Sequence, residues 1–169
     1  MELELKVGDL IVYPAHGVGR VESIEDEKKP DGGHHFVKIR ILDNGMQIMI
    51  PSRNVTEVGL RPLISKNDVS GLYKQLKTPP IFAEASNWNR RHRHYLDKLK
   101  TGAISDVCDV LRELMTMRGE KELSFGERKL LDTARSLLIK EVAMVTSREE
   151  AGVSEELDSF FPPPKATSA

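Results

Sequence analysis

The chain has 169 residues, of which 39% are hydrophobic and 30% are charged, and its net charge is −1. This length allows one ordinary domain or two small ones, with the composition of a soluble globular protein. No run approaches the roughly 18 apolar residues of a membrane span, and no signal peptide opens the chain, so we expect a cytoplasmic protein with no membrane partner. The single cysteine, Cys108, excludes an intrachain disulfide, and the five histidines lack a zinc-ligand spacing, so we expect no metal and no cofactor.

Positive charge is concentrated in one block of the chain. Residues 61–100 hold nine Lys or Arg and three Asp or Glu, whereas residues 1–60 hold seven and ten. A neutral protein with one basic block is suited to binding nucleic acid weakly at one place, with help from another partner.

The first sixty residues predict short strands joined by tight turns. Val37, Ile39 and Ile41 alternate with Lys38 and Arg40, which is the pattern of a half-buried strand. Turn-forming clusters at 28–33 and 43–45 separate the apolar runs. The sequence therefore predicts a small SH3/Tudor-like antiparallel β-barrel over residues 1–62, of the kind that commonly serves as an interaction module. The expected strands are 9–13, 18–27, 36–41, 46–50 and a short last strand at 53–58.

The strand at 46–51 is apolar on both faces. Met46, Ile48 and Ile50 alternate with Met49, and Pro51 ends the run. Either the second face is exposed on an edge strand that pairs with a partner's sheet, or the strand is central and covered on both sides.

From residue 63 onward the signals are those of helices. Ser65 with Asp68, Ser124 with Glu127, and Ser147 with Glu150 have the spacing of capping boxes. Gly102 and Gly119 mark helix ends. We therefore predict an α+β protein whose second domain, residues 63–160, is all-α with about five helices, followed by a proline-rich tail at 161–169 that is disordered or polyproline-like. The expected helices are 65–76, 86–101, 105–118, 124–145 and one starting at 147.

The helix at 86–100 contains the only tryptophan and the densest run of cations. Trp88, His92, Tyr95 and Leu99 share one face. Such a segment suits a surface that meets phosphates and bases, but the pattern alone slightly favours Trp88 packing in a helical core with Tyr95 and Leu99. The polar residues beside that face are Asn87, Arg90, Arg91, His94 and Lys98.

Signatures of catalysis are absent from the sequence. It has no phosphate loop, nucleophile elbow or dinucleotide fingerprint, and its acidic residues stand mostly at helix starts, where capping explains them. We therefore expect no enzyme activity and no small-molecule substrate.

Several motifs resemble the CarD family of bacterial transcription regulators, and most closely its short stand-alone CdnL members. The likeness covers nearly the whole chain in family order, and no helicase motifs of the transcription-repair coupling factor follow. The motifs are Asp9-Leu10-Ile11-Val12-Tyr13-Pro14-Ala15-His16-Gly17-Val18-Gly19, Met49-Ile50-Pro51, Trp88-Asn89-Arg90-Arg91 and Leu123-Ser124-Phe125-Gly126-Glu127-Arg128.

The resemblance implies a monomeric regulator that docks on the RNA polymerase β subunit and stabilises the promoter open complex. It implies that Trp88 is an exposed wedge at the upstream edge of the −10 bubble, with weak contacts to promoter DNA that read little sequence. The alternatives are a protein-only adaptor that bridges RNA polymerase to a second protein, and an RNA-binding module. The implied polymerase-binding residues are Ile48, Met49, Pro51 and Arg53. The implied DNA-binding residues are Asn87, Trp88, Arg90, Arg91 and Arg93, with Lys98, Arg128 and Lys129 as weaker candidates.

Overall fold

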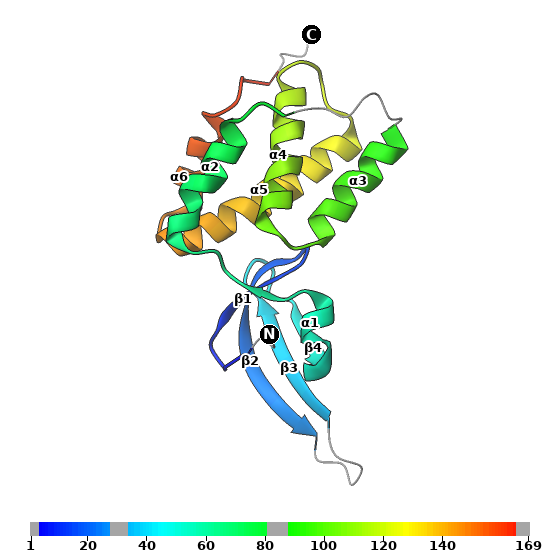
Figure 1. The fold of residues 1–169 in the computed structure, drawn as a ribbon, viewed down its shortest axis with the longest axis vertical. Coiled ribbons are helices and arrows are strands. Elements are labelled where there is room, and N and C mark those ends of the chain that lie inside the picture. Colours follow the sequence, from blue (N-terminus) through cyan, green and yellow to red (C-terminus); the bar gives the residue numbers. More distant parts are fainter. Residues whose placement is uncertain (1–3, 28–33, 81–87, 165–169) are drawn as a thin grey trace. The chain divides into compact units, whose positions relative to one another are not determined.

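The computed structural model describes residues 4–27, 34–80 and 88–164 (Figure 1). The chain divides into two compact units, Met1–Leu63 and Ile64–Ala169. The first unit is built on a β-sheet and the second is helical, so the predicted α+β class is confirmed. The predicted tail, 161–169, is described as far as residue 164, and Phe161 in it packs against the helical core. Residues 165–169 lie outside the described residues.

The first unit contains a five-stranded antiparallel sheet in the order β4-β3-β2-β1-β5. β2 and β3 form its long central hairpin (Figure 1). A β-bulge between Val21 and Ser23 shifts the register of that pair, which increases the local twist and helps the sheet curve. The strands are β1 Leu10–Tyr13, β2 Gly17–Glu27, β3 His34–Ile41, β4 Gln47–Pro51 and β5 Arg61–Pro62.

One face of this sheet forms the core of the first unit. Val37, Ile39 and Ile41 are all buried, as their alternation predicts. Gly19 lies inside β2, where a Cβ would stand 2.7 Å from Ile39 Cγ2. Gly19 is therefore required for the close approach of β2 to β3. β2 begins at Gly17, one residue before the predicted start.

The predicted strand at 53–58 is wrong. The segment forms a short 3₁₀ turn, Ser52–Asn54, followed by helix α1, Val55–Val58, which ends at Gly59 with φ 86°. The helical turn places Val55 in the sheet core together with Leu60. Burial of these side chains outweighs the β-propensity of a Val-Thr-x-Val segment, which is a weak preference that depends on context.

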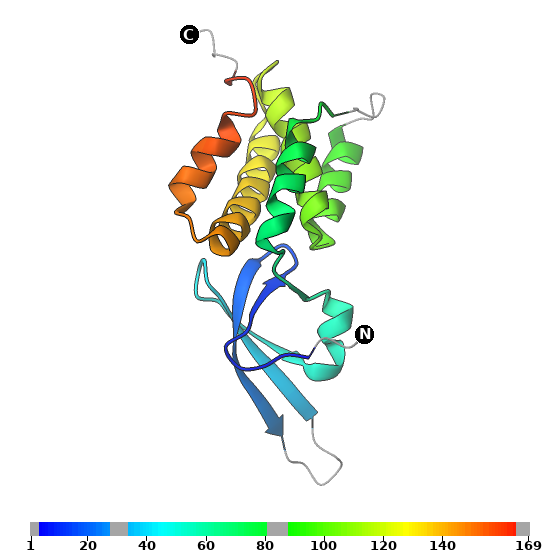
Figure 2. The same cartoon turned by 60° about the vertical axis from the view of Figure 1, so that its left-hand side comes forward.

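In its described residues the second unit contains five helices, the number that the sequence predicted, and they follow a 3₁₀ turn at Lys66–Asp68. α4 is the central element, in contact with α2, α3 and α5, and α6 packs against α5 (Figure 2). None of the helices in the described ranges is long and apolar enough to span a membrane. The helices are α2 Val69–Lys77, α3 Trp88–Lys100, α4 Ile104–Arg118, α5 Phe125–Thr146 and α6 Glu150–Asp158.

Two of the three predicted capping boxes are present. Ser65 with Asp68, and Ser124 with Glu127, make both reciprocal bonds. The box predicted at Ser147 is wrong, because Ser147 closes α5 in the left-handed conformation, with φ 53°, and Glu149 is the N-cap of α6. A serine that ends one helix is unable to hold the extended backbone that an N-cap requires.

Candidate functional site

Helix α3 attaches to the helical unit by one face and presents cations on the other. Tyr95 and Leu99 are buried in the core, while His92 and Leu96 are half-buried. Arg90 and Arg93 are exposed. The amphipathic spacing therefore determines which face of α3 packs against the core, and in the second half of the helix this is the predicted face. α3 begins at Trp88, whose side chain, like the whole of Asn87, lies outside the described residues.

Lys98 turns towards α4 and joins an ion-pair network there. Its Nζ lies 2.9 Å from Asp109 Oδ2, and Asp109 also binds Arg112 at 3.0 Å and the Gln75 amide at 2.8 Å. Burial of the Asp109 carboxyl opposes its ionisation, but hydrogen bonds from Lys98 and Gln75 outweigh burial and hold its pKa below the ordinary value. Lys98 is thus engaged within the fold, which a helical pattern alone does not reveal.

Arg91 is partly turned into the helical unit, unlike its neighbour Arg90. The Nε of Arg91 is buried and has no hydrogen-bond partner among the residues that the structure describes. The pKa of the Tyr95 hydroxyl is raised, chiefly by burial and then by the nearby Glu113 carboxylate, and the positive charge of Arg91 acts in the opposite direction. Arg91, one of the predicted DNA-binding arginines, is therefore partly packed within the fold and only partly exposed.

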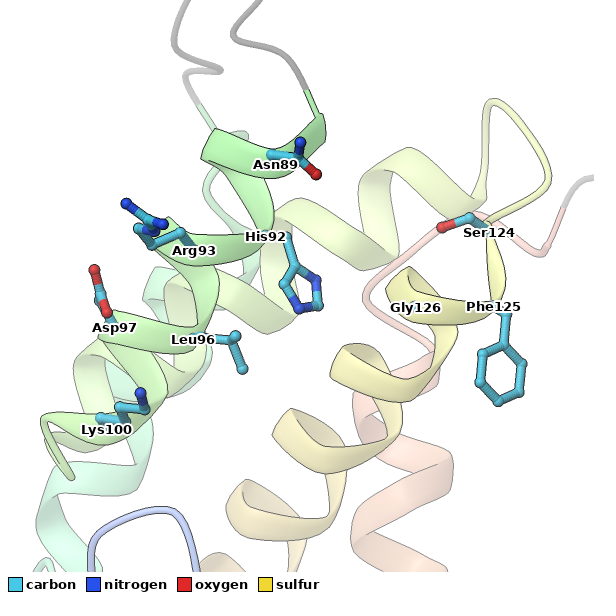
Figure 3. Close-up of a pocket in the computed structure, with 9 residues that line it drawn as sticks. All are labelled: Asn89, His92, Arg93, Leu96, Asp97, Lys100, Ser124, Phe125 and Gly126. Atoms are coloured by element: carbon cyan, nitrogen blue, oxygen red, sulfur yellow. The ribbon is translucent and has the colours of Figure 1, made fainter.

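An open groove lies between α3 and the start of α5, with a volume of about 840 Å³ (Figure 3). In Figure 3, the side chains of His92 and Leu96 extend from α3 towards the first turns of α5. The lining residues are Asn89, His92, Arg93, Leu96, Asp97, Lys100, Ser124, Phe125 and Gly126.

Phe125 is the functional candidate that the sequence reasoning missed. Its side chain is 77% exposed at the first position of α5, beside the groove. The sequence motif around Ser124 and Glu127 indicates a capping box and contributes to the family resemblance, but neither interpretation gives Phe125 a role. The available signal was that Phe125 precedes the apolar stripe of its helix, which starts at Leu130 and leaves the ring outside the core. Arg128 and Lys129 are exposed on the first turns of the same helix.

The second candidate surface is the edge strand β4. Met49 is 55% exposed and lies opposite Lys38 of β3, and Pro51 lies opposite Phe36. Ile48 points to the other face, where it packs against the sheet core. The structure thus supports the exposed alternative for the second face of this strand. Arg53, in the following turn, is also exposed.

A polar cluster borders this strand. The Glu22 carboxylate accepts a hydrogen bond from Arg40 Nε and another from Gln47 Nε2, the latter at 3.3 Å. Gln47 is the first residue of β4. The cluster therefore ties the start of the edge strand to β2 and β3, while Met49 remains open for contact.

Two family models together match most of the chain. The model of the CarD C-terminal domain matches residues 71–158, and the CarD-like/TRCF RID domain matches residues 5–64. The chain belongs to the CarD family. One relative, the putative transcription factor YdeB of Bacillus subtilis strain 168, is 31% identical over 143 residues, which are 83% of this chain and 91% of the relative.

Two solved structures are similar to part of the chain. The N-terminal domain of Myxococcus xanthus CarD, solved by NMR, is 35% identical and covers 37% of this chain and 83% of its own, with a TM-score of 0.30. CdnLNt from Myxococcus xanthus is 48% identical and covers 38% and 92%, with a TM-score of 0.31. The CarD assignment places the chain in a family of transcription factors.

Proposed function

We propose that the chain docks on the RNA polymerase β subunit through β4 and stabilises the promoter open complex through α3 and the start of α5. The observation that carries the proposal is the α3–α5 groove, which combines exposed cations with the exposed ring of Phe125. Cations that follow a phosphate backbone and aromatic rings that meet bases are the usual parts of a surface for opened nucleic acid.

The docking half of the proposal rests on the edge position of β4. An edge strand has backbone groups that a partner strand can pair with, and alternate side chains then set specificity. Met49 and Pro51 occupy such alternate positions on the outer face. We place the polymerase contact on these two residues, with Arg53 beside them and Ile48 as their support from the core.

The DNA half of the proposal assigns Trp88 as a wedge at the edge of the melted region. Inserting an aromatic side chain at a base step costs unstacking energy of about a few kcal/mol, and least where the duplex is already opening. Such a wedge binds the melted state more tightly than the closed duplex and shifts the population towards it. Phe125, on the neighbouring helix start, offers a second apolar surface for the opened strands.

Phosphate contacts then come from exposed cations on α3 and α5, of which Arg93 lines the groove. Arg90, Arg93, Arg128 and Lys129 are all exposed on α3 and α5. Contacts to phosphates position a protein without reading sequence, and a few of them give modest affinity that falls with salt. Docking on polymerase supplies the rest by raising the effective concentration of the DNA-contacting surface, and it brings the protein to the nucleoid.

The test compares promoter templates that are forked at the −10 region with fully paired templates, in the presence of RNA polymerase. We expect tighter binding to the polymerase complex on the forked template, and loss of that preference in Trp88→Ala. Equal affinity on both templates, with polymerase binding intact, would overturn the DNA half and favour a protein-only adaptor.

A further inference from the structure

The chain passes from the sheet to the helical unit over very few residues. Arg61 and Pro62 belong to β5 and pair with Val12 and Ile11 of β1. The helical unit begins at Ile64. Leu63 alone lies between Pro62, the last residue of the sheet, and Ile64, the first residue of the helical unit.

Ile64 is held to the helical unit by its backbone and its side chain. Its amide donates to Glu141 Oε2 at 2.9 Å, and its side chain packs against the helical core. The next residue, Ser65, begins the capping box with Asp68. Ile64 and Ser65 are therefore both fixed within the helical unit, and the Glu141 bond is the first of these attachments.

Glu141 is an unusual residue for its position. It is 2% exposed and lies in α5 beside the buried Val142 and Ala143. A buried carboxylate is unfavourable unless hydrogen bonds compensate it, and a charge-assisted bond to a backbone amide is among the stronger kinds. An apolar side chain would fill this space but would leave the Ile64 amide without its acceptor.

We propose that Glu141 is a positioning residue that confines the freedom between the two domains to a single hinge, Leu63. The functional part of this proposal rests on the proposed function, in which one domain docks while the other contacts DNA. A short tether preserves effective concentration, because fewer residues must be ordered when both surfaces engage. Ordering one further residue corresponds to about a 5- to 30-fold change in an equilibrium constant.

The experiment measures the distance distribution between two spin labels by double electron–electron resonance, on the whole chain without polymerase. Exposed positions Glu25→Cys and Glu155→Cys carry the labels, and buried Cys108 stays unlabelled. We expect Glu141→Leu to broaden the distribution and Glu141→Gln, whose amide oxygen still accepts from Ile64, to keep it narrow. The matched control is Glu122→Ala, at an exposed glutamate in the same unit.

Two further measurements keep the proposal testable if Glu141→Leu fails to fold. Leu63→Gly should broaden the distribution with both domains intact, since glycine widens the conformational range at the hinge. In the unsubstituted protein, the Ile64 amide should be protected from hydrogen exchange as strongly as the helical core. A rapidly exchanging Ile64 amide, or an unchanged distribution in a folded Glu141→Leu, would overturn the hinge.

The effect on the open-complex lifetime is measured separately from the distance distribution that reports on the hinge. Glu141→Leu and Leu63→Gly should shorten the open-complex lifetime at least about 5-fold, with affinity for the β subunit unchanged and Glu141→Gln restoring the lifetime. Broadened distances with an unchanged lifetime would overturn the positioning role. If Trp88→Ala also left the lifetime unchanged, the proposed function would fall while the hinge would stand.

Discussion

Replacement of Arg90 by glutamine should weaken the contact with promoter DNA in a salt-dependent way, whereas replacement of Lys98 by glutamine should not. Arg90 is exposed on α3. Lys98 lies on the same helix, but its Nζ is 2.9 Å from Asp109 and its side chain is only 26% exposed. Comparing the two variants therefore separates a cation that we propose contacts phosphate from one that stabilises the fold.

The expected magnitudes follow from these environments. One phosphate contact contributes about 0.9 to the slope of log affinity against log salt, so the ratio of wild-type to Arg90→Gln affinity should fall about 3.5-fold between 50 and 200 mM salt. The Lys98–Asp109 pair lies between an exposed pair and a buried one, so Lys98→Gln should lower the free energy of unfolding by about 1–2 kcal/mol.

The assay titrates each variant onto a preformed polymerase–promoter complex at several salt concentrations, and urea unfolding gives the stability of each. Lys66→Gln, at an exposed cation of the same unit, is the control for net charge. A salt-independent ratio for Arg90→Gln would refute the phosphate contact. A ratio for Lys98→Gln that falls with salt as steeply as that for Arg90→Gln would refute the structural role of Lys98.

Three further predictions concern other parts of the structure. Met49→Ala should lower affinity for the isolated β subunit by about 1 kcal/mol without changing stability, since the side chain is exposed; unchanged affinity in a pull-down titration argues against β4 as the docking strand. Glu127→Ala should lower the free energy of unfolding in urea by about 1 kcal/mol through loss of the Ser124 capping box, and a neutral result would show that the box contributes nothing. Burial raises the pKa of the Cys108 thiol from 9.0 to about 12. Above pH 9 the thiol ionises in the unfolded chain but not in the folded protein. The contribution of the buried thiol to the free energy of unfolding should therefore be lost as pH rises from 9 to 12. A Cys108→Ala variant that loses as much free energy of unfolding over that range would contradict this.

The sequence predicted the elements whose local signals agree with their packing. Val37, Ile39 and Ile41 alternate and fill the sheet core, and Ser124 with Glu127 caps α5 as a local motif should. The five helices were likewise readable from periodicity and turn residues, whereas the exposure of Met49 was one of two alternatives that the pattern left open. Each of these signals acts over a few residues, so no knowledge of the tertiary structure was needed.

The sequence-based predictions fail where tertiary contacts determine the local backbone structure. Val55 is drawn into the sheet core by a helical turn, against the local strand preference. Ser147 has the right spacing for a capping box, but its backbone conformation is set by the end of α5. A sequence window contains no information about these longer-range demands.

The candidate site shows the same division. The sequence indicated that α3 carries cations, but not that Lys98 pairs with Asp109 or that Arg91 has a buried Nε, since both depend on α4 and its neighbours. Phe125 lies in a motif that the capping box already explains, so the sequence offers no separate reason to assign its ring a role. Its exposure became evident only when the apolar stripe of α5 was placed against the core.

The central claim is tested most directly by the lifetime of promoter open complexes formed by bacterial RNA polymerase after addition of a competitor. The lifetime is measured with no regulator, with the wild-type protein, and with Trp88→Ala at a concentration that saturates the β subunit. The account predicts a longer lifetime with the wild-type protein and a return towards the unregulated value with Trp88→Ala. An equal lifetime in all three reactions, with β-subunit binding confirmed, would contradict it.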